Sequence, residues 1–343
     1  MEFGGSPVTV GSGRRIVLTR DAAAASLLAS PPAVHHLYGI RIKTPWPITG
    51  VAREHGDCDV EFVEGDVTML ADAASHVPAE QRQRWAQYAA LSDGSSYRRW
   101  SGLFEFLVTP DARCIHARTL GQTNEEALLA YLLVDALSFS MVRLGREPLH
   151  ATAVVTPHGV VAFVGESGDG KSTLGALLVR HGFRLVTDDM LVLTFDGDEC
   201  VAHAGPPRIK LYRHIADRIF DAGYSGVPMN PVTEKLIIPL NHDQSVNRPH
   251  PLRAIYLIHA RHHGGAVRAP GIRQLSPAVA FPQVLAATAS HYAFERERLA
   301  RQFNFLTRLL EKVPVKTLAY PRDENSMAAL RDTVLADLDR VVN

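Results

Sequence analysis

A loop that reads Gly165-Glu166-Ser167-Gly168-Asp169-Gly170-Lys171-Ser172 decides the fold, because it fits the pattern G-x-x-x-x-G-K-[ST] at every fixed position. An apolar run at 160–164 precedes it, and a run of helical character at 174–181 follows it. Glycines let such a loop turn its backbone amides toward phosphate oxygens, and the helix N-terminus adds a partial positive charge. The sequence therefore predicts a strand, a phosphate loop and a helix, which form the core of an α/β nucleotide-binding domain.

The residues of this loop have distinct expected roles. We expect Lys171 to contact the β- and γ-phosphates of a nucleotide and the Ser172 hydroxyl to ligate magnesium. The predicted ligands are therefore ATP and Mg²⁺. The expected nucleotide-binding residues are Gly165, Glu166, Ser167, Gly168, Asp169, Gly170, Lys171, Ser172 and Thr173.

An aspartate pair, Asp188-Asp189, follows the next apolar run at 183–187. A carboxylate at the end of a strand downstream of a phosphate loop is typical of a magnesium ligand. Two adjacent carboxylates can divide the work, since one can hold the metal while the other accepts a proton from an attacking hydroxyl. The alternative role of the pair is structural, as a turn or a helix N-cap. His150, just before the strands that lead into the loop, is either a polar residue at a strand start or a group near the γ-phosphate.

Three separated segments, 150–151, 161–172 and 181–189, together resemble the catalytic domain of the HPr kinase/phosphorylase family. The resemblance implies a P-loop-containing, HPr-kinase-like α/β domain and an ATP- and magnesium-dependent protein serine kinase. It implies that Asp188 is the catalytic base, that Asp189 helps Ser172 to hold magnesium, and that His150 supports the base. Together with Lys171, Asp188 and His150 form the expected catalytic set. The family's hexamers make a homo-oligomer an expectation for this chain as well.

The overall layout is most similar to the HPr-kinase-like proteins of peptide-modifying gene clusters. Some of these kinases phosphorylate a serine of lasso-peptide precursors. The predicted function is therefore transfer of the γ-phosphate of ATP to a serine hydroxyl of a peptide or protein, such as a ribosomal precursor peptide. Three alternatives stay open: a nucleotide-binding regulatory ATPase, an HPr(Ser) kinase/phosphorylase proper, and a small-molecule kinase.

Two basic residues, Arg208 and Lys210, alternate with apolar residues on a predicted strand at 208–212 and so share one face of it. They are either contacts to phosphate or to the acceptor, or part of a solvated strand face.

The chain is expected to form two domains. Residues 1–122 carry short β-like runs and one helical segment at 78–90, which predict a smaller mixed α+β domain with a role in acceptor recognition. Thr123 and Glu126 form a capping box that begins a linking helix at 123–145. Residues 123–343 would form the catalytic domain.

Composition excludes several classes of protein. Lys+Arg and Asp+Glu both number 36, so the basic excess of a nucleic-acid binder is missing. The 3 cysteines lie far apart, which argues against a disulfide framework or a structural zinc and for a reducing compartment. The N-terminus has no apolar signal-peptide core, and the apolar run at 127–144 contains charged residues that a membrane span disfavours. We therefore expect a cytoplasmic protein with a peptide or protein partner and without nucleic-acid or membrane binding.

Overall fold

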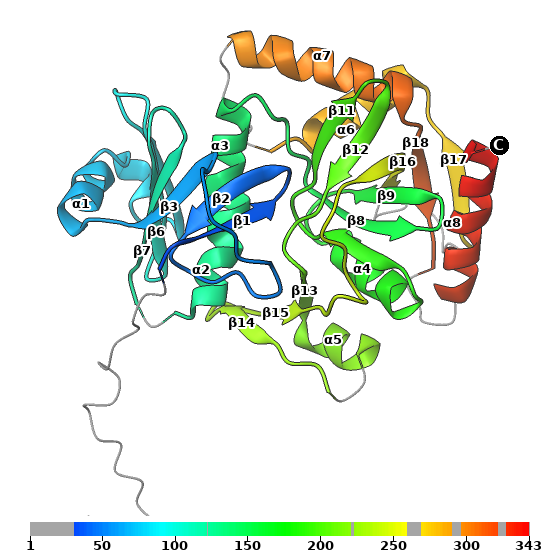
Figure 1. Cartoon of the computed structure of the whole chain (residues 1–343), viewed down its shortest axis with the longest axis horizontal. Helices are drawn as coiled ribbons and strands as arrows, with labels where there is room; N and C mark the ends of the chain where they lie inside the picture. Colours follow the sequence, from blue (N-terminus) through cyan, green and yellow to red (C-terminus); the bar gives the residue numbers. More distant parts are fainter. Residues whose placement is uncertain are drawn as a thin grey trace, which may run out of the picture.

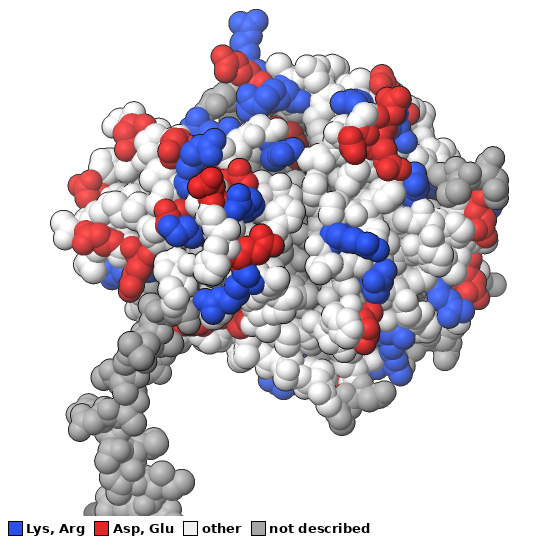
Figure 2. Space-filling view, in the orientation of Figure 1, with Lys and Arg blue, Asp and Glu red and all other residues white. Residues whose placement is uncertain are grey.

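The computed structural model describes residues 31–121, 123–220, 223–258, 269–289, 296–321 and 327–342. The described chain is a mixed α/β structure with three β-sheets (Figure 1). Within these residues, no helix has both the length and the apolar character that a bilayer span needs. Basic and acidic side chains are interspersed over the face seen in Figure 2, in keeping with a formal net charge of zero.

The first sheet has seven strands in the order β1-β2-β3-β7-β6-β5-β4. Strands β4 to β7 form an antiparallel meander, whereas β3 runs parallel to both β2 and β7. The elements of this part are β1 (Ala33–Leu37), β2 (Ile40–Thr44), β3 (Val60–Glu64), α1 (Val67–Ser75), the 3-10 turn η1 (Ala79–Gln81), β4 (Ala86–Ala90), β5 (Ser96–Trp100), β6 (Phe104–Val108) and β7 (Cys114–Thr119).

The prediction of a helix at 78–90 is wrong. Only the short turn η1 is helical there, and Ala86–Ala90 forms strand β4. The alanines of this segment favour a helix intrinsically, but β4 pairs along its whole length with β5, from Ala86 opposite Trp100 to Ala90 opposite Ser96. Tertiary pairing therefore overrides local helix propensity.

One long helical segment covers the first sheet. It consists of α2 (Glu125–Tyr131), a π-helical stretch η2 (Leu132–Ala136) and α3 (Leu137–Arg143). Tyr131 packs its ring 5.1 Å from the rings of both Trp100 and Phe104, so the helix and the sheet share one core.

The linking helix exists, but its predicted cap is wrong. Asn124, not Thr123, is the N-cap, and its side chain accepts a hydrogen bond from the amide of Ala127 at 2.7 Å. Glu126 does not complete a capping box, because its carboxylate binds Arg208 at 3.0 Å and accepts a hydrogen bond from Thr49. The residue predicted to close the helix end instead ties that end to a strand far along the chain.

The second sheet contains the predicted nucleotide-binding core. Its order is β10-β8-β9-β16-β12-β11, with β18 beside β16 and β17 beside β18. Its strands are β8 (Ala151–Thr156), β9 (Gly159–Val164), β10 (Arg184–Thr187), β11 (Val192–Asp196), β12 (Glu199–His203), β16 (His250–Ile258), β17 (Gly271–Gln274) and β18 (Val315–Ala319).

Helices cover both faces of this sheet (Figure 1). Helices α4 (Lys171–Arg180) and α8 (Met327–Val342) pack on one face, and α6 (Pro277–Ala286) and α7 (Arg296–Lys312) on the other.

A third, three-stranded sheet lies beside α2 and α4 in the order β13-β15-β14. It comprises β13 (Arg208–Tyr212), β14 (Val227–Asn230) and β15 (Thr233–Pro239), and α5 (Arg213–Ile219) follows β13 directly. The strand predicted at 208–212 is therefore confirmed as β13, in a sheet separate from the one that ends in the loop.

Candidate functional site

The three predicted segments of the site meet at one edge of the second sheet. Strand β8 is antiparallel to both β9 and β10, so β9 and β10 end at the edge where β8 begins. The loop 165–172 follows β9, Asp188 and Asp189 follow β10, and His150 precedes β8. Strand order alone thus brings together residues that are well separated in sequence.

The loop needs glycine at several positions, and Gly170 and Gly165 show the two reasons. Gly170 is the N-cap of α4 and has a left-handed backbone, with φ of 90°. A Cβ atom on Gly165 would lie 2.7 Å from the carbonyl oxygen of Ile258, at the end of the neighbouring strand β16. No side chain caps α4, so its first amides are available to an anion.

Lys171 lies folded back over the loop. Its Nζ donates to the carbonyls of Gly165 at 2.8 Å and Glu166 at 2.9 Å. Asp169 accepts a hydrogen bond from the amide of Glu166 at 2.6 Å, which closes the loop on itself. Burial lowers the pKa of Lys171. The loop therefore holds a buried cation at the position where a phosphate group would bring negative charge.

A hydrogen bond joins the loop to the aspartate pair. The Ser172 hydroxyl donates to Oδ1 of Asp188 at 2.9 Å, and the buried hydroxyl of Thr152 donates to the same oxygen at 2.6 Å. The amide of Lys210 donates to Oδ2 at 3.0 Å. Three donors from three different elements hold this carboxylate in one place, beside the hydroxyl predicted to ligate magnesium.

The pKa values of the two aspartates are shifted in opposite directions. Burial, together with the negative charge of the neighbouring Asp189, raises the pKa of Asp188 to about 6. Burial acts in the same direction on Asp189, but Lys210 lies with its Nζ 2.5 Å from Oδ2 and holds the pKa of Asp189 well below its usual range. Asp188 is therefore the more basic carboxylate of the pair, and Asp189 stays ionised.

His150 and Asp189 are joined through the backbone. The Nδ1 atom of His150 lies 2.9 Å from the carbonyl oxygen of Asp189, whose left-handed φ of 74° is rare for a residue with a side chain. Burial, reinforced by the charge of Lys171, lowers the pKa of His150, so the ring is neutral at pH 7 and can donate from Nδ1. The imidazole thus holds the unusual left-handed backbone turn at Asp189.

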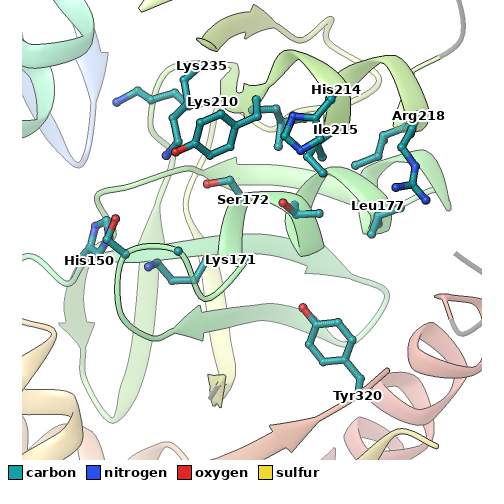
Figure 3. A pocket seen from close by; sticks show the side chains of 17 residues that line it. His150, Lys171, Ser172, Leu177, Lys210, His214, Ile215, Arg218, Lys235 and Tyr320 are labelled. Carbon is teal, nitrogen blue, oxygen red and sulfur yellow. The ribbon is translucent and has the colours of Figure 1, made fainter. Parts of the chain in front are cut away.

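A cavity of about 400 Å³ opens over the loop (Figure 3). In Figure 3, His150 lies at one end of it, while Leu177 and Arg218 lie at the other. The polar end is lined by His150, Ser167, Lys171, Ser172, Lys210 and Lys235. The loop therefore faces open space large enough for a small molecule.

The two basic residues of β13 have different surroundings. Arg208 does not line the cavity, since it binds Glu126 and donates to the carbonyl of Leu129 at 3.0 Å. Lys210 lines the cavity and donates to Asp189. Both residues are buried, with 7% and 5% exposure, so the interpretation as a solvated strand face is wrong. Both cations donate to carbonyl oxygens just before the π-helical stretch η2. Arg208 donates to Leu129, and Lys210 donates to Ala130 at 3.5 Å.

Thr152 and Lys235 also belong to the site. Thr152 stands two residues after His150 on β8, and the alternation of a strand could have placed it on the same side as His150. Lys235 stands opposite Tyr212 in the β13–β15 pair and lines the cavity, whereas its neighbour Glu234 is exposed. No local pattern signals Lys235, because its position depends on how the third sheet lies against the loop.

The oxygen donors around the loop fit magnesium. Within the described residues, no cluster of three or more His, Cys, Asp or Glu side chains could enclose a metal ion. Magnesium is usually held by one or two carboxylates, several waters and the phosphates of a substrate, so a closed protein cage is not required. Ser172 and the adjacent aspartate pair provide a hydroxyl and carboxylate oxygens of the kind that this ion prefers.

We expect Ser172→Ala to raise the magnesium concentration needed for half-maximal nucleotide turnover by roughly 10-fold or more, because it removes a hydroxyl ligand. Nucleotide affinity should change less, since the backbone amides of the loop remain. Ser167→Ala is the matched control, because Ser167 lines the same cavity from the same loop. An equal magnesium response in the two variants would contradict a metal-binding role for Ser172.

Comparisons with known proteins give a distant likeness among solved structures. No family model matches the chain, and no curated protein matches it. Among solved structures, it is similar to the HPr(Ser) kinase/phosphatase from Coxiella burnetii, with 14% sequence identity and a TM-score of 0.33. The match covers 57% of this chain and 99% of that one. A likeness this distant assigns no role to any residue, so the roles proposed below rest on the geometry of the site.

Proposed function

We propose that this protein is a magnesium-dependent P-loop kinase of the HPr-kinase-like kind that transfers the γ-phosphate of ATP to a serine hydroxyl of a peptide or protein. The observation that carries the proposal is the hydrogen bond from Ser172 to Asp188. It joins a loop suited to phosphate with a carboxylate whose pKa is raised to about 6. A carboxylate of that basicity accepts a proton from a hydroxyl more readily than an ordinary aspartate does.

The residues would divide the work as follows. The amides at the start of α4 and Lys171 would hold the phosphates, and Asp188 would take the proton of the attacking serine. Ser172 and Asp189 would hold magnesium, which neutralises charge on the phosphates when it is bound. His150 would act as a positioning residue, since its hydrogen bond fixes the backbone of Asp189.

A regulatory ATPase is the competing function, with water as the acceptor. Both functions need the loop, the metal and a base, because an attacking water must lose a proton just as a serine hydroxyl does. The raised pKa of Asp188 suits either acceptor at neutral pH, so the two functions differ in whether the phosphate ends on a chain or in solution. The third option, a small-molecule kinase, would use the same machinery with a smaller acceptor.

A polypeptide acceptor is favoured by the close attachment of the N-terminal part of the chain, which we propose takes part in acceptor recognition. Arg208 ties the third sheet to α2 through Glu126. Asn230 of β14 donates to the hydroxyl of Tyr131 at 2.7 Å. These contacts tie α2, which covers the seven-stranded sheet, to the third sheet that carries Lys210 and Lys235.

The acceptor class is tested with γ-labelled ATP, magnesium and the products of neighbouring genes, followed by mass spectrometry. We expect phosphoserine on a peptide or protein chain. Label found only on a small molecule would contradict the polypeptide acceptor while leaving the kinase machinery intact.

A further inference from the structure

The cavity over the loop has a second, apolar end that phosphate binding does not use. Its lining there comes from Leu177 on α4, from Ile215 and Ile219 on α5, and from Tyr320 just beyond β18. In Figure 3, Leu177 lies with Arg218 at the end of the cavity opposite His150, and Tyr320 lies on the other side of α4 from Ile215. A charged triphosphate chain does not pack against such an apolar surface, whereas the faces of a nucleobase do.

The α4 helix links the two ends of this cavity. Thr173 follows Ser172 at the start of α4, and Leu177 lies one turn further along the same face. A nucleotide with its terminal phosphate near Lys210 and its inner phosphates near Thr173 would therefore extend its base toward Leu177. The cavity volume of about 400 Å³ lies within the range of small-molecule sites.

We infer that the apolar end formed by Leu177, Ile215, Ile219 and Tyr320 binds the adenine base of ATP. This inference rests on the proposed function and adds the part of the site that selects a nucleotide over free polyphosphate. Leu177 and Ile215 are half-buried residues at the rim of the core shared by α4, α5 and α8, so they present apolar surface to the cavity without filling it. His214 and Arg218 add polar groups along α5.

The base would be recognised mainly by apolar contact. The residues that line the cavity, as far as the structure describes it, include neither Asp nor Glu. A carboxylate is the acceptor that could pair with the N–H groups of guanine, and a site built on such a bond rejects other bases strongly. An apolar surface discriminates far less, so we expect ATP and GTP to bind with affinities within about 10-fold of each other.

The test compares a ligand with a base and a ligand without one. Calorimetry would measure the affinities of Mg-ATP and of magnesium tripolyphosphate for the full-length protein. We expect the wild type to bind ATP more tightly than tripolyphosphate. Leu177→Ala should weaken ATP binding by about 10-fold, because it removes apolar contact with the base, and should leave tripolyphosphate binding unchanged.

Leu335→Ala is the matched control. Leu335 is also a half-buried leucine at the rim of the same core, but it lines a different cavity beside His181. It should leave both affinities unchanged. Ile215→Ala, which should repeat the effect of Leu177→Ala from the opposite helix, serves as a second variant if Leu177→Ala fails to fold.

The outcomes separate this inference from the proposed function. Equal wild-type affinities for ATP and tripolyphosphate would overturn the base site and leave the phosphate loop intact. The same loss for both ligands in Leu177→Ala and Ile215→Ala would also overturn it, because these residues would then act through the loop. Failure of the wild type to bind either ligand would instead refute the proposed function itself.

Discussion

Asp188→Asn should lower the rate of phosphoryl transfer by ~10²–10⁴-fold while leaving ATP binding nearly unchanged. The substitution keeps the shape of the side chain and an amide oxygen that can accept the hydrogen bonds of Thr152 and Ser172. It removes the basic carboxylate. Because the pKa of Asp188 is raised to about 6, this group is largely ionised at pH 7 and yet basic enough to accept a proton. Single-turnover transfer and nucleotide affinity, measured on the same preparation, check this expectation.

Asp189→Asn is the natural comparison, since Asp189 is adjacent and its carboxylate is held by Lys210. Lys210 holds its pKa well below the usual range, so Asp189 is a poor base and an ionised metal ligand. Its loss should appear as a higher magnesium requirement, with transfer restored when magnesium is raised. If magnesium rescues Asp188→Asn and not Asp189→Asn, the two carboxylates have exchanged roles.

Lys171→Ala should lower turnover of ATP by roughly 10²–10³-fold, because it removes the charged donor that reaches over the loop. Its Nζ now binds the carbonyls of Gly165 and Glu166, so the cation is already placed above the phosphate cradle. Titration of Mg-ATP should show weakened binding as well as slow turnover, in contrast to Asp188→Asn.

Lys43→Ala controls for the general loss of a positive charge. Lys43 lies in an exposed ion pair with Glu61 on the first sheet, 2.7 Å apart, and is expected to contribute nothing to turnover. Turnover of Lys171→Ala at the level of Lys43→Ala would exclude the loop as the site of phosphate binding.

The local part of the site could be predicted from sequence because its information is local. The strand before the loop and the helix after it are encoded by contiguous apolar runs and by Gly170, and the structure has β9 and α4 at these places. The aspartate pair follows a strand, as expected, because the short apolar run before it forms β10. Strand β10 pairs with β8, which is also the partner of the strand β9 that leads into the loop.

The parts that could not be predicted depend on long-range packing. Nothing near Lys210 in sequence indicates that β13 forms a separate sheet, or that its lysine reaches Asp189 while Arg208 binds α2. The segment at 86–90 is a second example in which long-range pairing decides the structure. Its alanines favour a helix locally, but pairing with β5 makes it a strand. Patterns with a period of a few residues cannot report such contacts.

The fate of the γ-phosphate in a single turnover distinguishes a serine acceptor from water. Wild-type protein and Asp188→Asn would be incubated with γ-labelled Mg-ATP and the pooled products of neighbouring genes, and phosphoserine and free phosphate would be quantified together. We expect labelled phosphoserine from the wild type and at least 10²-fold less from the variant. Release of free phosphate at the same rate by both proteins, with no phosphoserine formed, would contradict this expectation and establish water as the acceptor.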